Sequence, residues 1–150
     1  MRLKIPPAIV FLVHVLLVWL VAEYLPQTQI EVPGRLALVQ VIGTAGVVLG
    51  VVAAGLFRRA GTTLDPVGVE KASKIVDSGL YRFTRNPMYL GLTLILLAWV
   101  IWKSNGLGIL GVISFVWYIN EFQIKPEEEA LTEKFGEEYE QYKRRVRRWI

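Results

Sequence analysis

Two polar segments flank an apolar hairpin and carry the residue types best suited to binding a charged small molecule. The first, residues 79–91, reads Gly-Leu-Tyr-Arg-Phe-Thr-Arg-Asn-Pro-Met-Tyr-Leu-Gly and leads directly into an apolar run. The second is the acidic cluster Glu127–Glu129, which follows the next apolar run. Charged groups at the boundary between membrane and water are costly unless they are paired or bind something. The pattern therefore predicts a site for a charged ligand at a membrane surface.

The composition excludes several kinds of catalytic site. The chain has 150 residues, which suits one domain over residues 1–150, and 53% of them are hydrophobic. It has no cysteine, which excludes disulfides, thiolate metal ligands and cysteine nucleophiles. Its single histidine, His14, lies inside an apolar run. We therefore expect no metal site and no Ser-His-Asp triad, and we interpret His14 as a packed or hydrogen-bonded side chain.

Four apolar segments must position the polar groups, and they lie at residues 7–25, 36–57, 88–102 and 107–122. A helix needs roughly 20 apolar residues to span a bilayer, with about 17 as the lower limit. The first two segments are long enough, and the last two read as a helical hairpin. The first lacks a small-x-small cleavage site, so we expect a retained helix rather than a signal peptide. The expected fold class is all-α, a polytopic membrane bundle with about four transmembrane helices.

The second apolar segment carries a face of small residues, namely Gly43, Ala45, Gly46, Gly50, Ala53, Ala54 and Gly55. Small residues let helices approach closely in lipid. We expect a packing interface within the bundle, with a homodimer interface as the alternative.

The basic residues predict an orientation. They gather before the first apolar segment, between the second and the third, and after the fourth: Arg2, Lys4, Arg58, Arg59, Lys71, Lys74, Arg82, Arg85, Lys125 and the run 143–148. With four spans these regions share one side, which the positive-inside rule places in the cytoplasm. Both termini are then cytoplasmic. The connection 58–85, with its turn-rich part 61–66, is expected to be ordered and to pack on the bundle.

The C-terminal part is predicted to be one amphipathic helix that begins near Glu127. Pro126 and the three glutamates suit the first turn of a helix. An apolar stripe follows at spacings of three and four, formed by Leu131, Phe135, Tyr139, Tyr142, Val146 and Trp149. Such a helix lies on a membrane or caps a bundle, and Gly136 weakens its middle. The basic run 143–148 is interpreted as an anchor on an anionic phospholipid surface.

The two polar segments, in this order and with an apolar hairpin between them, resemble a known family. Gly79-Leu-Tyr-Arg-x-x-Arg-Asn-Pro-x-Tyr-x-Gly91, followed by Glu127-Glu-x-x-Leu-x-x-x-Phe-Gly-x-x-Tyr-x-x-Tyr-x-x-x-Val146, is similar to the isoprenylcysteine carboxyl methyltransferase family. That family shares its C-terminal region with the membrane phospholipid methyltransferases. The resemblance covers residues 58–149. It implies a cofactor-binding core there, an N-terminal helix pair over residues 1–57, and S-adenosylmethionine (SAM) as the cofactor.

Carried over to this chain, the resemblance implies cofactor contacts at Ser73, Lys74, Ile75, Val76, Tyr81, Asn86, Pro87, Met88, Tyr89 and Glu127. Two positions depart from the family pattern. Asn86 stands where members often have a histidine, which excludes an imidazole acid–base role. Gln123 stands where the animal enzymes have an arginine assigned to the substrate, which argues against a prenylated carboxylate as the acceptor.

The residue chemistry agrees with a SAM site. Arg85 or Asn86 could bind the carboxylate of the methionine end, and Glu127 could bind its ammonium. The rings of Tyr81 and Tyr89 could face the sulfonium or the adenine, because aromatic faces attract cations. Alignment and exclusion of water supply much of the catalysis of methyl transfer.

The candidate catalytic residues are therefore Arg85, Asn86 and Glu128. Glu128 is the candidate base, which an amine acceptor needs and a carboxylate acceptor does not. No metal ion is required.

Three other interpretations remain open. The arginines and tyrosines could each be interfacial anchors, and the glutamates a helix-start device. A membrane reductase of related fold would bind NADPH, whose 2′-phosphate would need more basic residues than Lys71 and Lys74. A non-catalytic scaffold would tolerate Glu127→Ala and bind no SAM. The acceptor is expected to be a small lipophilic or amphiphilic molecule that enters between the helices, with oxygen, nitrogen or sulfur as the methylated atom. The oligomeric state is left open, and no nucleic-acid partner is expected.

Overall fold

The computed structural model of the protein describes residues 5–61 and 73–150. This part of the chain is all-helical, with 78% helix and no strand. Arg2, Lys4, Lys71 and most of the turn-rich part of the 58–85 connection lie outside the described residues.

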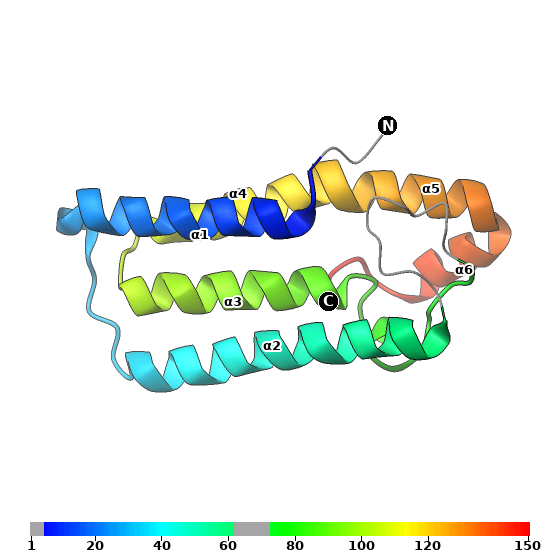
Figure 1. Ribbon diagram of the computed structural model, residues 1–150, viewed down its shortest axis with the longest axis horizontal. Coiled ribbons are helices and arrows are strands. Elements are labelled where there is room, and N and C mark those ends of the chain that lie inside the picture. Colours follow the sequence, from blue (N-terminus) through cyan, green and yellow to red (C-terminus); the bar gives the residue numbers. More distant parts are fainter. Residues whose placement is uncertain (1–4, 62–72) are drawn as a thin grey trace.

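Four long helices run side by side along the molecule (Figure 1): α1 (Pro7–Tyr24), α2 (Arg35–Ala60), α3 (Pro87–Lys103) and α4 (Gly108–Ile119). Their bounds follow the four apolar segments. Two short 3₁₀ helices, η1 (Pro26–Thr28) and η3 (Gly79–Arg82), lie in the connections. By length and composition α1 and α2 can each cross a membrane, whereas α3 has 17 residues.

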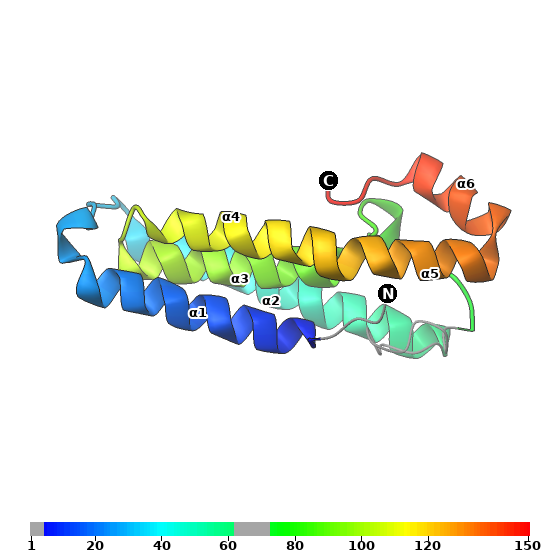
Figure 2. The ribbon, with the colours of Figure 1, turned by 90° about the horizontal axis from the view of Figure 1, so that it is seen from above.

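The fourth helix does not end where the sequence suggested. A π-helical turn, η4 (Asn120–Ile124), joins α4 directly to α5 (Lys125–Phe135), and Figure 2 shows the three as one rod. The expected helix is present as α5, which starts at Lys125, close to Glu127, but it continues the rod. The three glutamates therefore do not stabilise a free helix N-terminus. Pro126 provides no backbone N–H, and the wider π turn just before it is one way for a helix to accommodate such a loss.

The expected single C-terminal helix is two helices. Gly136 adopts φ 55° and ψ −128°, a conformation that glycine reaches without steric cost, and it ends α5. The chain then doubles back through α6 (Glu137–Arg145) toward the start of α3 (Figures 1 and 2). Most of the apolar stripe is used as expected. Tyr139, Tyr142 and Val146 are buried together, and Ile75, Leu131 and Phe135 pack on them.

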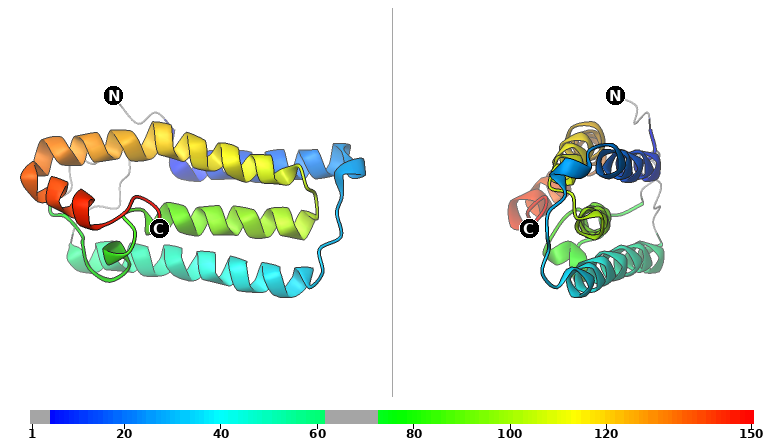
Figure 3. Two further views of the ribbon diagram at one scale, coloured as in Figure 1. Left: turned by 180° about the vertical axis from the view of Figure 1, so that it is seen from behind. Right: turned by 90° about the vertical axis from the view of Figure 1, so that its left-hand side faces the viewer.

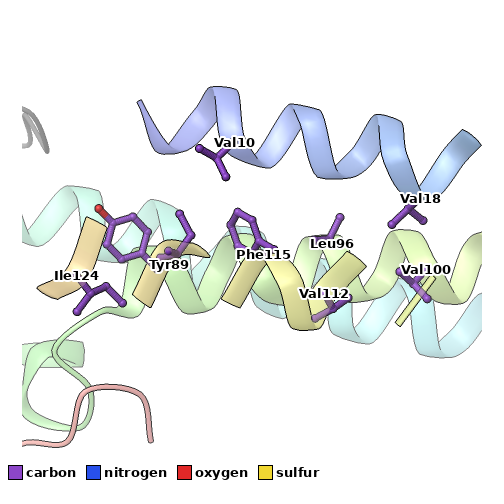
Figure 4. Packing of buried hydrophobic residues seen from close by; sticks show 9 residues of the cluster. Val10, Val18, Tyr89, Leu96, Val100, Val112, Phe115 and Ile124 are labelled. Carbon is purple, nitrogen blue, oxygen red and sulfur yellow. The ribbon is translucent and has the colours of Figure 1, made fainter. Parts of the chain in front are cut away.

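Helix α3 lies between α1 and α4 on one side and α2 on the other (Figure 3). The main core fills the space between α1, α3 and α4, where Val18, Leu96, Phe115 and Ile119 are almost fully buried (Figure 4). His14 belongs to this packing. Its Nδ1 lies 2.8 Å from the Val10 carbonyl oxygen and its ring meets the Phe115 ring edge-on at 5.4 Å. The interpretation of His14 as a packed, hydrogen-bonded side chain is confirmed.

The connections at the two ends of the bundle differ. At one end the backbone N–H of Ile30 donates to the Ser104 carbonyl over 2.8 Å, and that of Gly106 donates to the Thr28 carbonyl over 3.0 Å. These bonds tie the α1–α2 connection to the α3–α4 turn. The polar segments 79–87 and 120–128 meet at the opposite end, together with the C-terminal tail.

Glycines allow α2 and α3 to cross in backbone contact. A Cβ built on Gly46 would lie 2.7 Å from the carbonyl oxygen of Gly91, and one built on Gly91 would lie 2.7 Å from that of Gly46. Ala53, further along the same helix, is fully buried. The small-residue face of α2 is therefore a packing interface within the bundle, as expected.

This crossing makes a testable prediction. We expect Gly46→Ala to lower the free energy of unfolding by about 1–3 kcal/mol, because the new methyl group meets backbone that cannot move aside. Gly50→Ala is the matched control one turn away, since nothing lies within 4 Å of a Cβ at that position. Unfolding of the purified protein by titration with a denaturing detergent measures both. Equal midpoints for the two variants would contradict the prediction.

Candidate active site

The start of α3 holds the end of the chain in place. The backbone N–H of Arg85 donates to the Arg147 carbonyl over 3.0 Å. The Thr84 hydroxyl and the Asn86 side-chain amide both donate to the Arg148 carbonyl, over 3.2 and 3.0 Å. The expected site residue Asn86 therefore fixes the tail across the N-terminus of α3.

The guanidinium of Arg85 is engaged by three protein acceptors. Its Nη1 donates to the carbonyls of Lys143 and Val146 over 3.1 and 2.5 Å, and its Nη2 donates to Glu128 over 2.7 Å. Its Nε is buried without a partner among the described residues. Arg85 thus connects α3, α5 and the end of α6, and most of its hydrogen-bonding capacity is used for that purpose.

Glu128 is bound by two arginines. Besides Arg85, Arg148 donates to it through Nε over 3.1 Å and through Nη2 over 2.6 Å. Burial opposes ionisation of Glu128, but the hydrogen bonds from Arg148 and Arg85 outweigh it and lower the pKa of the carboxyl below its ordinary value. A carboxylate held in this state is a weak proton acceptor, which disfavours the base role expected for Glu128.

The neighbouring carboxyl has a different environment. The Tyr89 hydroxyl donates to Glu127 over 2.5 Å. Burial raises the pKa of Glu127 to about 7, the Tyr89 hydrogen bond lowers it in part, and the charge of Glu128 raises it further. The two adjacent glutamates therefore differ in pKa, because two arginines outweigh the effect of burial at Glu128, whereas one tyrosine hydrogen bond offsets it only in part at Glu127.

Tyr81 lies near this pair and is largely buried. Its side chain is buried against Ala53 and Val76, its ring meets Phe57 edge-on at 5.1 Å, and its carbonyl accepts a hydrogen bond from Tyr142 over 2.8 Å. The hydroxyl itself is buried and has no partner in the described part of the chain. Burial raises the pKa of Tyr81, and the charges of Tyr142 and Glu127 add to this effect. Buried hydroxyl groups are rarely left unpaired, so this atom suits a polar ligand atom.

The other expected cofactor residues are distributed unevenly. Val76 is buried beside Tyr81, with Met88 partly buried against the same cluster, and Pro87 is buried at the start of α3. Ile75 packs instead on the tyrosines of α6. Ser73 and Lys74 are exposed, and the Ser73 hydroxyl donates to the Gly61 carbonyl over 3.4 Å. The structure thus brings Val76, Tyr81 and Met88 together, and Tyr89 to Glu127, but leaves Ser73 and Lys74 at the surface.

An open groove lies between α4 and the C-terminal tail. It has a volume of about 610 Å³ and is lined by Arg85, Ile113, Val116, Trp117, Asn120, Arg148 and Trp149. At its polar end Arg148 Nη1 donates to the Asn120 side-chain oxygen over 3.0 Å. Gln123 lies outside the lining, since it is buried and donates to the Ile5 carbonyl over 2.6 Å.

Thr84, Asn120, Tyr142 and Arg148 were not predicted to contribute to the site. Arg148 was assigned to the membrane anchor along with its basic neighbours, but it points inward to Glu128 and Asn120. Its position between Val146 and Trp149, two members of the apolar stripe, was the only signal that it differs from Arg144 and Arg145. Asn120 could likewise have been predicted as a site residue, because it is a polar residue within an apolar run.

Comparison with known proteins identifies the family. A family model described as phospholipid methyltransferase matches residues 36–138, which include α2 to α5 and the start of α6. An uncharacterized protein of Haemophilus influenzae is 59% identical over 63 residues, which are 42% of this chain and the whole of that protein. No solved structure matches the chain. Taken with the apolar helices, the family match shows that this chain belongs to the phospholipid methyltransferase family of integral membrane proteins.

Proposed function

We propose that the protein transfers a methyl group from SAM to a lipophilic or amphiphilic acceptor at the cytoplasmic face of a membrane. The family supports methyl transfer. The observation that carries the choice of cofactor is the group formed by Glu127, Tyr89 and Tyr81. It combines a carboxyl with a pKa of about 7 and a buried hydroxyl that has no partner among residues 5–61 and 73–150.

These residues fit the charged parts of SAM. The Glu127 carboxylate is suited to the ammonium of the methionine end. The Tyr81 hydroxyl, which no group in the described part of the chain bonds, is suited to a polar atom of the same ligand. The rings of Tyr81 and Tyr89 offer apolar faces that attract a cation. Arg85 is assigned a positioning role here, in place of carboxylate binding, because the protein already occupies both of its terminal nitrogens.

The chemistry needs little from the protein beyond placement. When bound, SAM supplies an electrophilic methyl group whose bond to sulfur breaks, with the electron pair remaining on sulfur, as a lone pair of the acceptor forms the new bond. The cluster of Ala53, Val76 and Tyr81 is buried, which suits a site from which water is excluded.

SAM binding to the protein in nanodiscs, measured by calorimetry, tests the proposal. We expect binding by the wild type, weaker binding by Tyr81→Phe and loss of binding by Glu127→Ala. Glu129→Ala is the matched control, because Glu129 lies on the same helix but is exposed. Labelled SAM with lipid extracts would then identify the acceptor. Failure of the folded wild-type protein to bind SAM would contradict the proposal, and NADPH binding would favour the reductase alternative.

We further propose that α1 to α4 all cross the membrane, with both termini and the candidate site in the cytoplasm. Large apolar side chains on α1, α2 and α4 are exposed, among them Leu12, Val41, Val51 and Ile113. Arg58 and Arg59 end α2 at the same end of the bundle as the tail. There α6, with exposed Arg144 and Arg145, would face anionic phospholipids.

The chain has no cysteine, so single cysteines can report this topology. We expect an impermeant thiol reagent added outside intact cells to label Gln27→Cys. The matched variant Ser78→Cys is at an exposed position at the other end of the bundle, and we expect its labelling only after permeabilisation. The reverse pattern would contradict the orientation.

A further inference from the structure

Helix α6 contacts the short turn that carries Tyr81. We propose that Tyr142, on α6, is a positioning residue for the candidate cofactor site. Its hydroxyl fixes the backbone of Tyr81 and thereby sets the place of the Tyr81 hydroxyl, without touching the cofactor itself. This inference rests on the proposed function, because the effect that it assigns to Tyr142 is an effect on SAM affinity.

A buried hydrogen bond joins the two residues. The Tyr142 hydroxyl donates to the Tyr81 carbonyl over 2.8 Å, and both residues are only 4% exposed. Tyr81 lies near the C-terminal end of η3, where carbonyls lack partners within the helix itself. The backbone N–H groups of Thr84 and Arg85, the next candidates along the chain, donate to other carbonyls. Tyr142 therefore supplies from a distant helix the donor that the turn does not provide.

The opposite side of the turn is packed against α2. Gly79 adopts φ 57°, and a Cβ built on it would lie 2.8 Å from the Leu56 side chain, so the start of η3 lies directly on α2. The Phe57 ring meets the Tyr81 ring edge-on at 5.1 Å. Helix α2 thus holds the ring of Tyr81, and α6 holds its carbonyl. With both ends of the residue fixed, the hydroxyl at the tip of the ring is fixed as well.

Helix α6 is itself held in place by contacts that do not involve the Tyr142 hydroxyl. Arg85 Nη1 donates to the carbonyls of Lys143 and Val146 over 3.1 and 2.5 Å. Ile75 packs on the apolar cluster that contains Tyr142 and Val146. Tyr142→Phe keeps the ring in that cluster and removes one oxygen atom. The variant therefore tests the hydrogen bond to Tyr81 rather than the packing of α6.

A double-mutant cycle on SAM affinity tests this role. Calorimetry in nanodiscs compares the full-length wild type, Tyr142→Phe, Tyr81→Phe and the double variant. We expect Tyr142→Phe to weaken SAM binding about fivefold, which corresponds to one hydrogen bond. In the Tyr81→Phe background the same change should weaken binding by less than about twofold, because the hydroxyl that Tyr142 places is already absent. A merely structural role would weaken binding equally in both backgrounds.

The position of Tyr81 can also be followed without SAM. A fluorinated tyrosine is incorporated at position 81, and its fluorine NMR resonance is recorded in the free protein. Tyr142→Phe should shift or broaden this resonance. Tyr139→Phe is the matched control, since Tyr139 is buried in the same cluster on the same helix. Its hydroxyl makes no hydrogen bond to residues 73–82 in the described part of the chain, so we expect an unchanged resonance and wild-type SAM affinity.

Three results would overturn the inference. The first is an equal loss of affinity from Tyr142→Phe with and without the Tyr81 hydroxyl. The second is an equally large loss in Tyr139→Phe, which would indicate a general weakening of α6. The third is an unchanged resonance at position 81 in Tyr142→Phe.

These outcomes are distinct from a failure of the proposed function. Absence of SAM binding by the folded wild type would contradict that function, and the resonance would still report whether Tyr142 fixes Tyr81. Should Tyr142→Phe fail to fold, a difluorinated tyrosine at position 142 changes the strength of the donor with little change in shape. Its effect on SAM affinity should again require the Tyr81 hydroxyl, and an equal effect in Tyr81→Phe would overturn the inference.

Discussion

Glu128→Gln is expected to destabilise the protein by about 3–5 kcal/mol, because it removes the partner of two arginines and leaves a buried charge uncompensated. The Arg85 and Glu128 side chains are only 10% and 11% exposed. The effect should extend beyond α5, since the same guanidinium holds the Lys143 and Val146 carbonyls at the end of the chain. Loss of Glu128 would therefore also loosen the tail over the start of α3.

Detergent-induced unfolding measures the loss of stability, and limited proteolysis reports release of the tail. Glu129→Gln is the matched control, because it makes the same chemical change on the same helix at an exposed position. The two effects of Glu128→Gln and Arg148→Gln should not add, since both variants break one shared contact. Wild-type stability in Glu128→Gln would show that the three groups do not form a coupled unit.

The long helices were predictable because a helix that crosses a bilayer needs a long, continuous run of apolar residues, and such a run can be recognised in the sequence without knowing its contacts. The expected segments 7–25 and 88–102 correspond to α1 (Pro7–Tyr24) and α3 (Pro87–Lys103). The continuity of α4 with α5 was not predictable in the same way. Proline followed by glutamates suits a helix start, and it also occurs here after a π turn. Local sequence signals do not distinguish these two cases.

The partners within the site depend on contacts between distant residues. Tyr89 and Glu127 were both predicted as cofactor residues, but their direct hydrogen bond joins positions 38 residues apart and follows from the packing of α3 beside the α4–α5 rod. The inward position of Arg148 depends on the reversal at Gly136. The sequence indicates that Gly136 weakens a helix. It does not indicate the direction of the chain after Gly136, which depends on the burial of Tyr139 and Tyr142.

SAM binding is expected to depend on pH through Glu127, whose pKa is about 7. If the carboxylate form binds the cofactor ammonium, the protein must release a proton before binding at lower pH. The affinity should then be nearly constant above about pH 8 and fall by up to tenfold per pH unit below pH 7. Between pH 7.5 and 5.5 this amounts to about 25-fold. Glu127→Gln should bind weakly, with no pH dependence over this range.

The free protein should show the opposite trend in stability. The pKa of Glu127 is about 7 in the folded chain, compared with the ordinary 4.5. Between pH 4.5 and 7 the folded chain therefore holds a proton on Glu127 that the unfolded chain lacks. The contribution of Glu127 to stability is therefore lost as pH rises from about 4.5 to 7. Calorimetry in buffers of different ionisation enthalpy measures the proton released on SAM binding, and detergent unfolding at several pH values measures stability. Both trends should disappear in Glu127→Gln and persist in Glu129→Gln. A pH-independent affinity in the wild type would mean that Glu127 does not bind the cofactor as a carboxylate.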